Sequence, residues 1–146
     1  MRLAICNETF QEWPFPKAFA KAKELGYEAI EFAPFTIDKN VYNITAEQRE
    51  TVRDQVLDAG LEVTGLHWLL AFTEGYYLTS PEADVRKKTT AYLEELARLC
   101  RDLTGSIMVL GSPFQRNLLP GVTLPEAMGY AADVIKGTVD TLAETG

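Results

Sequence analysis

Four short apolar runs alternate with amphipathic helical patterns, and this alternation constrains the fold more than any other feature of the sequence. The runs cover residues 2–6, 28–32, 61–66 and 106–110. No hairpin turn signal joins one run to the next, so each strand is connected to the following one by a helix. Strands joined by crossover helices lie parallel, and those helices cover them on their outer side. The sequence therefore predicts an α/β protein with four β/α units in series.

Turn and capping residues bound the first two predicted helices. The first covers residues 15–25 and stops at Gly26, and the second opens with a capping box at Thr45 and Gln48 and ends at Gly60. Their spacing of apolar residues predicts the face that packs on the sheet. The residues expected on that face are Phe15, Ala18, Phe19, Ala22 and Leu25 in the first helix and Val52, Val56 and Leu57 in the second.

The last two helices carry similar signals. Ser80 is expected to cap the third helix, with Pro81 at its first position, and Thr123 with Glu126 forms a capping box for the fourth. The residues expected to face inward are Val85, Thr89, Tyr92, Leu93, Leu96, Leu99, Cys100 and Leu103 in the third helix and Met128, Ala131, Ile135, Val139 and Leu142 in the fourth.

Two architectures contain such a series, a doubly wound sheet and a (β/α)8 barrel. No Gly-rich phosphate loop follows any strand, and residues 7–10, Asn-Glu-Thr-Phe, cannot cradle a pyrophosphate as a dinucleotide-binding fold does. Four units occupy 146 residues, so eight would need roughly twice that length, somewhat above a plain barrel of about 250 residues. We expect residues 1–146 to form one domain, the first half of such a barrel, and this evidence leaves the doubly wound sheet open.

Composition excludes several classes of function. The net charge is −7, which disfavours nucleic acid as a partner, and no apolar run approaches the ~20 residues of a membrane span. The N-terminus is too short and polar after Ile5 to be a signal peptide. Cys6 and Cys100 lack metal-type spacing and are expected to be buried free thiols. These features predict a cytoplasmic protein.

Polar side chains occur where the predicted strands end. In a parallel barrel these positions form the face that carries the chemistry. Asn7 follows the first strand, Glu31 lies in the second, and His67, the only histidine, ends the third. Such a set predicts a pocket for a small polar ligand. The candidate substrate-binding residues are Asn7, Phe10, Glu31, His67, Trp68, Gln115 and Arg116. One histidine and scattered carboxylates lack the spacing of metal ligands, so no metal site is predicted.

Each of these residues also has a structural interpretation. A carboxylate inside a strand costs several kcal/mol unless it is paired or solvated, so Glu31 could be held by the backbone or by an arginine. His67 could be a hydrogen-bonded structural histidine, and Trp68 could belong to the core. Arg116 could bind a phosphate or carboxylate, or could be an exposed loop arginine.

Several blocks of the sequence are similar to one known superfamily. They are RLAICNETF at residues 2–10, YEAIEFAPF at 27–35, GLHWLL at 65–70, EGYYLTSPEADVRKKTTAYLEELARLCRDL at 74–103 and IMVLGSPFQRN at 107–117. Together they resemble the N-terminal half of the xylose-isomerase-like sugar phosphate isomerase/epimerase superfamily. The resemblance implies a (β/α)8 TIM barrel, here a half barrel of about four units.

The resemblance also implies a chemistry. Isomerases and epimerases of this superfamily use a divalent metal, often Mn, Mg, Co or Zn, and move a proton between adjacent carbons of a sugar. The family's principal metal ligands, Glu, Asp, His and Glu, lie on its last four strands, so the metal is not expected to bind to this half alone. His67 matches a third-strand histidine that touches substrate and, in a related DNA-repair branch, a metal. Glu31 matches a pocket carboxylate, and Gln115 and Arg116 match a loop at the mouth.

Three hypotheses follow for the function. The first is that this chain is half of a metal-dependent sugar or sugar-phosphate isomerase/epimerase. The second is a non-catalytic half barrel for binding or assembly, and the third, disfavoured by the acidic charge, is an abasic-site endonuclease of the same superfamily. Because four strands leave two sheet edges and an uncovered face, we also predict self-association.

Overall fold

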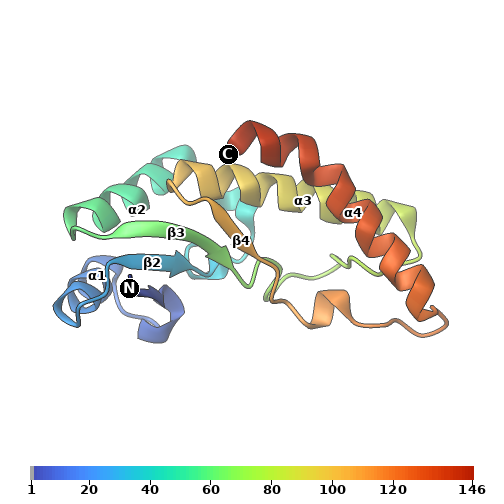
Figure 1. Cartoon of the computed structure of the whole chain (residues 1–146), viewed down its shortest axis with the longest axis horizontal. Coiled ribbons are helices and arrows are strands. Elements are labelled where there is room, and N and C mark those ends of the chain that lie inside the picture. Colours follow the sequence, from blue (N-terminus) through green and yellow to red (C-terminus); the bar gives the residue numbers. More distant parts are fainter. Residues whose placement is uncertain (1) are drawn as a thin grey trace.

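The computed structural model describes residues 2–146 and contains one sheet of four parallel strands. The strands are β1 (Ala4–Cys6), β2 (Ala29–Phe32), β3 (Glu62–His67) and β4 (Ile107–Val109), and their order in the sheet is the order in the chain (Figure 1). A doubly wound sheet reverses its strand order at a switch point, whereas a barrel adds each strand beside the previous one. The sheet is therefore half of a (β/α)8 barrel, as predicted.

Four helices follow the strands in turn. They are α1 (Phe15–Glu24), α2 (Ala46–Asp58), α3 (Ala83–Asp102) and α4 (Leu124–Thr145). Each helix packs against the next, and α3 and α4 lie side by side along much of their length (Figure 1). Within residues 2–146, no helix is long and apolar enough to cross a membrane.

The core lies between one face of the sheet and the helices. Ile30, Phe32 and Leu66 are fully buried there, and Phe19 from α1 meets Phe32 edge-on with ring centroids 5.9 Å apart. Burying a side chain of this size stabilises the fold by about 1.5–3 kcal/mol. Because side chains alternate along a strand, this packing forces the residues between them, such as Glu31, toward the opposite face.

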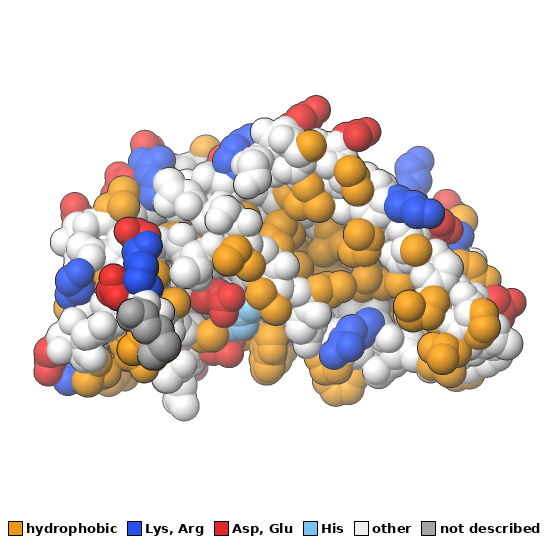
Figure 2. Space-filling view, in the orientation of Figure 1, with side chains coloured by type: hydrophobic (Ala, Val, Ile, Leu, Met, Phe, Trp, Pro, Cys, Tyr) orange, Lys and Arg blue, Asp and Glu red, His pale blue; other side chains and the backbone are white. Residues whose placement is uncertain are grey.

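The opposite face is open to solvent at its β4 edge. Ile107 and Val109 are 52% and 44% exposed, while Met108 between them packs on the core. Apolar side chains gather on the face shown in Figure 2. In a closed barrel this face is the packed interior. The sheet thus leaves apolar surface that a complete barrel would cover.

Four sequence predictions of element bounds and facing need correction. Strand β1 begins at Ala4, not at residue 2. Helix α3 begins at Ala83 rather than Pro81, because the Ser80 hydroxyl accepts a hydrogen bond from the Glu82 amide in the preceding turn. Leu57 on α2 and Leu25 after α1 point to solvent rather than inward.

The fourth correction concerns the buried face of α4. The predicted inward residues Met128, Ile135, Val139 and Leu142 are exposed, whereas Ala127, Val134, Thr138 and Thr141 are buried. Helix α4 packs on α3 through small and hydroxyl side chains, and a Cβ at Gly137 would lie 2.8 Å from a Thr90 methyl carbon. The helix therefore turns its larger apolar residues away from the rest of the chain.

Strands β3 and β4 approach each other most closely at Gly65. Gly65 pairs with Ile107, and a Cβ on Gly65 would overlap the Ile107 carbonyl oxygen. On the other side of β3, the register with β2 shifts between Ile30 and Glu31, which brings Glu31 opposite Gly65. The missing side chain at residue 65 therefore sets the spacing of β3 and β4.

We predict that Gly65→Ala destabilises the protein by about 2 kcal/mol or more, because the added methyl group forces β4 away. Denaturant unfolding followed by circular dichroism measures the change. Gly129→Ala on α4 is the matched control, since nothing lies within 4 Å of its added Cβ, and it should stabilise the protein by about 0.4–1 kcal/mol. Equal stability of Gly65→Ala and the unmodified chain would contradict this account.

A network of ion pairs joins α2 to α3. Arg49 contacts Glu95 at 2.6 Å and Asp102 at 2.9 Å, and its Nε donates to the Ile44 carbonyl. Burial of Asp102 opposes ionisation, but hydrogen bonds from Arg101 and Arg49 outweigh it and hold the pKa of this carboxyl below its ordinary value. A carboxyl with a lowered pKa stabilises the fold above its unfolded pKa, and that contribution is lost as the pH falls through the folded pKa.

The stabilisation by Asp102 should therefore be present above about pH 4, near the unfolded pKa of aspartate, and be lost at lower pH. Asp102→Asn should have a lower free energy of unfolding than the unmodified chain at neutral pH. This difference in free energy should become smaller as the pH falls below about 4. Urea unfolding across this range measures it, with the exposed Asp140→Asn as control. A stability difference that does not change with pH would contradict a stabilising role for the ionised Asp102 carboxylate.

Candidate functional site

Three side chains with metal- or substrate-binding atoms meet at the carboxyl ends of β1, β2 and β3. Cys6 pairs with Glu31 across the sheet, and its thiol donates to Glu31 Oε2 at 3.3 Å. The same Oε2 lies 3.5 Å from His67 Nδ1. One ligand atom from each residue lies within 4.8 Å of the other two. We call Cys6, Glu31 and His67 the strand-end cluster.

The sheet geometry explains why these residues meet. Ile30 and Phe32 occupy the core, so Glu31 between them points to the barrel interior. Leu66 likewise faces the core, which sends His67 to the interior side. Gly65, opposite Glu31, adds no side chain on that side. The register therefore places the carboxylate beside the imidazole.

His67 is buried but poorly hydrogen-bonded. It is 6% exposed, and neither ring nitrogen has a well-aligned hydrogen-bond partner among the described residues, although Nε2 lies 3.0 Å from Glu8 Oε2. The Glu8 oxygen is buried and unpartnered in the same way within residues 2–146. A buried polar group without a partner costs about 1–3 kcal/mol. A buried histidine with a purely structural role would have hydrogen-bond partners on its ring nitrogens, so the structural interpretation of His67 is disfavoured.

The surroundings of the Cys6 thiol oppose its ionisation. Burial raises the pKa of Cys6 to about 11, assisted by its hydrogen bond to Glu31 and by the charges of Glu31 and Glu8. The thiol is therefore protonated at neutral pH when nothing positive is bound. Both cysteines are free, as the sequence predicted, but Cys6 is only partly buried.

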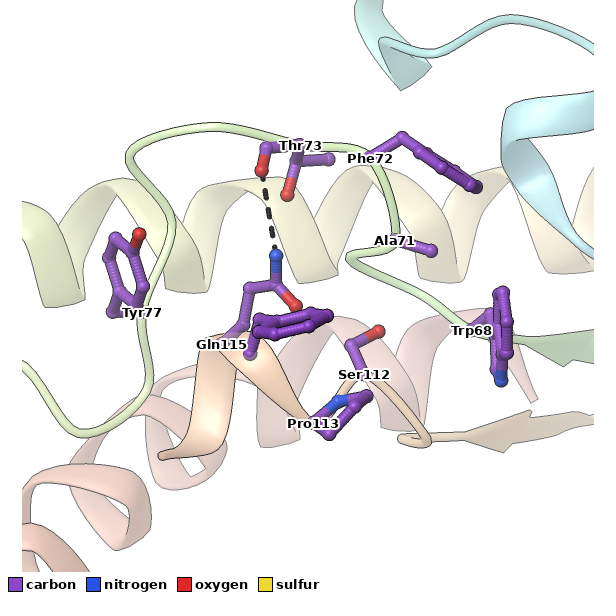
Figure 3. A pocket seen from close by; sticks show the side chains of 9 residues that line it. Trp68, Ala71, Phe72, Thr73, Tyr77, Ser112, Pro113 and Gln115 are labelled. Atoms are coloured by element: carbon purple, nitrogen blue, oxygen red, sulfur yellow. Dashed lines mark hydrogen bonds between the residues drawn. The ribbon is translucent and has the colours of Figure 1, made fainter. Parts of the chain in front are cut away.

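A cavity of about 510 Å³ lies between the loops that follow β3 and β4 (Figure 3), and one of its walls is Trp68, the residue after His67. Trp68, Phe72 and Tyr77 form apolar walls, and Ser112 and Gln115 add polar groups. The remaining residues that line it are Ala71, Thr73, Pro113 and Phe114. Its size and mixture of aromatic and polar groups are typical of small-molecule sites.

The two polar residues in this cavity are fixed by the backbone. The Ser112 hydroxyl accepts from the Leu70 amide at 2.9 Å, and the Gln115 carboxamide donates to the Thr73 carbonyl at 3.5 Å (Figure 3). Both bonds join the loop after β4 to the loop after β3. The amide oxygen of Gln115 points into the cavity as an acceptor of the kind that a hydroxylated ligand uses.

Two walls of the cavity hold strained backbone. Trp68 has φ 52° and Phe72 has φ 60°, in the left-handed region that costs a non-glycine residue roughly 1–2 kcal/mol. Trp68 is 42% exposed, and its ring lies 6.1 Å from that of Phe35. Strain of this kind is concentrated at ligand-binding sites in proteins. Trp68 is thus a cavity wall rather than part of the core.

The other predicted site residues lie apart from the cavity. Asn7 is buried and ties two loops together, because its carbonyl accepts from the Ala33 amide and its amide donates to Thr36. Phe10 is half-buried against Trp13, beside a different surface hollow. Arg116 is exposed and does not line the cavity.

The comparison with protein families agrees with the architecture. Residues 19–146 match the family model described as a xylose isomerase-like TIM barrel. The chain belongs to this family. This confirms the superfamily and the half-barrel fold that the sequence blocks predicted. No curated protein sequence matches the chain at a significant level.

Solved structures share the fold. A D-psicose 3-epimerase crystallised in the presence of D-fructose superposes with a TM-score of 0.78 at 19% identity, and the match covers 100% of this chain and 50% of the epimerase. The D-psicose 3-epimerase from Clostridium cellulolyticum H10 with D-tagatose gives 0.76 at 14% identity, with the same two coverages. A 3-keto-D-glucoside 4-epimerase from E. coli gives 0.73 at 17% identity, covering 100% and 53%. The chain thus spans about half the length of these structures.

Spacing along the sequence did not reveal the full site. The expectation of no metal site rested on that spacing, whereas the sheet brings Cys6 beside Glu31 and His67 from positions 25 and 61 residues apart. A signal was present, because Cys6 ends β1 and Glu31 is the second-last residue of β2. Phe72 and Tyr77 carried no such signal, since they lie in an irregular loop.

Proposed function

We propose that this chain forms the substrate-binding wall of a metal-dependent sugar or sugar-phosphate isomerase/epimerase. The observation that carries the proposal is the aromatic cavity that begins at Trp68, after the carboxyl end of β3, in a sheet that has the fold of half an epimerase barrel. In barrel enzymes this end of the sheet carries the chemistry.

The cavity chemistry suits a sugar. Flat rings such as those of Trp68 and Tyr77 cover the C–H faces of a sugar, while Ser112 and Gln115 present polar atoms to hydroxyl groups. Structural neighbours were crystallised with D-fructose, D-tagatose and D-allulose. We infer a ketohexose, or its phosphate, as the ligand class for this cavity.

The proposed reaction moves a proton between adjacent carbons of that sugar. By the family resemblance, the divalent metal and the acid–base carboxylates lie on strands that follow the fourth. The metal would polarise the carbonyl and hydroxyl oxygens. The residues of this chain would bind the sugar and orient it, with Ser112 and Gln115 as the hydrogen-bonding groups.

We also propose that a second half barrel covers the open face. Ile107 and Val109 are exposed on the interior side of β4, and α4 presents Met128 and Val139 to solvent. Strands β1 and β4 are both edges of the sheet. In a longer polypeptide the following β/α units would cover these surfaces, and in this chain alone a second copy is the available partner.

Self-association is therefore expected for residues 1–146 on their own. Light scattering during size-exclusion chromatography should show a dimer or larger species that persists on dilution to micromolar concentration. Val109→Lys should weaken association, because it places a charge in the covered face, while Lys87→Glu at an exposed position of α3 serves as a charge-change control. A monodisperse monomer would contradict the proposal.

Sugar binding can be tested with the two tryptophans. Trp13→Phe leaves Trp68 as the only tryptophan, and Trp68→Phe leaves Trp13. Titration with D-fructose, D-tagatose or D-allulose should change the fluorescence of the Trp13→Phe protein saturably and leave the Trp68→Phe protein unchanged. At about 0.3 kcal/mol per non-hydrogen atom, the dissociation constant should be about millimolar.

Mannitol is the matched control, since it has the hydroxyl groups of a hexose but no carbonyl and no ring. It should bind more weakly than the ketoses. If neither ketoses nor their phosphates saturate the Trp68 signal, the cavity is not a sugar site and the proposed function falls.

A further inference from the structure

We propose that Cys6, Glu31 and His67 form a binding site for a divalent transition-metal ion of the zinc class, with Glu8 orienting the histidine. The ligands come from β1, β2 and β3, whereas the family resemblance puts the family's principal metal ligands on later strands. The site is therefore a different one, and it does not rest on the proposed sugar chemistry.

The set of donor atoms selects the class of ion. A thiolate, an imidazole and a carboxylate together are typical ligands of Zn²⁺ and Co²⁺, while Mg²⁺ and Ca²⁺ prefer oxygen ligands alone. The thiolate, Glu31 and the nearby Glu8 carboxylate supply negative charge that offsets the charge of the ion. Three protein ligands would leave a fourth position open to water or to a ligand.

Two of the three distances between donor atoms fit tetrahedral coordination, and the third, between the thiol and the imidazole, is at most 4.8 Å. Bonds of about 2.0–2.3 Å at tetrahedral angles place neighbouring ligand atoms roughly 3.3–3.8 Å apart. Cys6 Sγ lies 3.3 Å from Glu31 Oε2, and His67 Nδ1 lies 3.5 Å from the same oxygen. An ion bound between these atoms would bring the thiol and the imidazole to a similar separation.

The unpartnered histidine is an independent indication. His67 is only 6% exposed, yet neither of its nitrogens has an aligned hydrogen-bond partner among residues 2–146. With an ion on Nδ1, the opposite nitrogen Nε2 must carry a proton, and Glu8 Oε2 lies 3.0 Å from it. A carboxylate that accepts from the second nitrogen is the usual partner of a metal-bound histidine. An ion on Nδ1, together with a small rotation of the Glu8 or His67 side chain that aligns this pair, would give both groups a partner.

Metal binding would also change the state of the thiol. Ions of the zinc class bind cysteine as the thiolate, so binding through Cys6 Sγ must displace the thiol proton. One proton is then released for each ion bound, and affinity rises with pH. This dependence distinguishes a thiolate ligand from adsorption on surface carboxylates.

The test uses the full chain without a histidine tag, stripped by a chelator and titrated with Co²⁺ and then Zn²⁺. We expect one ion per chain, visible Co²⁺ bands of tetrahedral strength and a sulfur-to-cobalt charge-transfer band in the near ultraviolet. Zn²⁺ should bleach these bands and raise the thermal midpoint of unfolding. Proton release into weak buffer gives the stoichiometry independently.

The variants separate the ligands from their surroundings. Cys6→Ser should remove the charge-transfer band and weaken binding at least tenfold, whereas Cys100→Ser, which removes the other thiol, should change neither. Glu8→Gln should keep the band but weaken binding about 10–100-fold, as loss of an orienting carboxylate does. Cys6→Ser is nearly isosteric at a partly buried position, and its circular dichroism confirms folding.

Three results would overturn the proposal. They are substoichiometric binding, a charge-transfer band that survives Cys6→Ser, and a band that disappears in Cys100→Ser. The outcome is independent of the sugar titration, so the metal site and the proposed function can fail separately.

Discussion

The close approach of β3 and β4 at Gly65 is the constraint on which the rest of the structure depends. A backbone without a side chain at that point lets β4 pair with β3 and leaves room opposite Glu31. The same spacing brings the loops after β3 and β4 together, where Ser112 and Gln115 bridge them. Both the strand-end cluster and the cavity therefore follow from one glycine in the third strand.

The helices cover only one face of the sheet, and this determines where polar groups can lie. The helix side is closed and apolar, so a carboxylate there would be severely desolvated. The interior side is open near β4, where Ile107 and Val109 are exposed, and near the end of β3 Glu8 from the turn after β1 lies 3.0 Å from His67. Glu31 and His67 lie at the boundary between these regions, half-buried and buried respectively. At such a boundary a charged group is shielded from water, which strengthens its interaction with a ligand, and it stays accessible enough for the ligand to enter and leave.

The sequence predicted the periodic parts of the molecule well. Alternation of Ile30, Glu31 and Phe32 was sufficient to place a carboxylate on the interior face, and the parallel order of strands followed from the helical connections. The buried face of helix α4 was predicted wrongly because the helix has two candidate packing faces. Small residues such as Gly137 and Thr138 pack against α3, while Met128 and Val139 form a second apolar face. Hydrophobicity alone favours the larger side chains, although close helix packing requires the smaller ones.

The candidate site was predictable where strands carry it and, through the family resemblance, at Gln115 in the loop after β4. Register converts position in a strand into position in space, and this is how Cys6 meets Glu31. The cavity walls Phe72 and Tyr77 belong to a loop whose path depends on tertiary hydrogen bonds, including one from the Tyr77 amide to the Thr89 hydroxyl. Because that loop is held by α3, the shape of the cavity depends on the packing of the helical layer. Ligand specificity in this fold can therefore change through loop and helix contacts while the strand-end cluster stays in place.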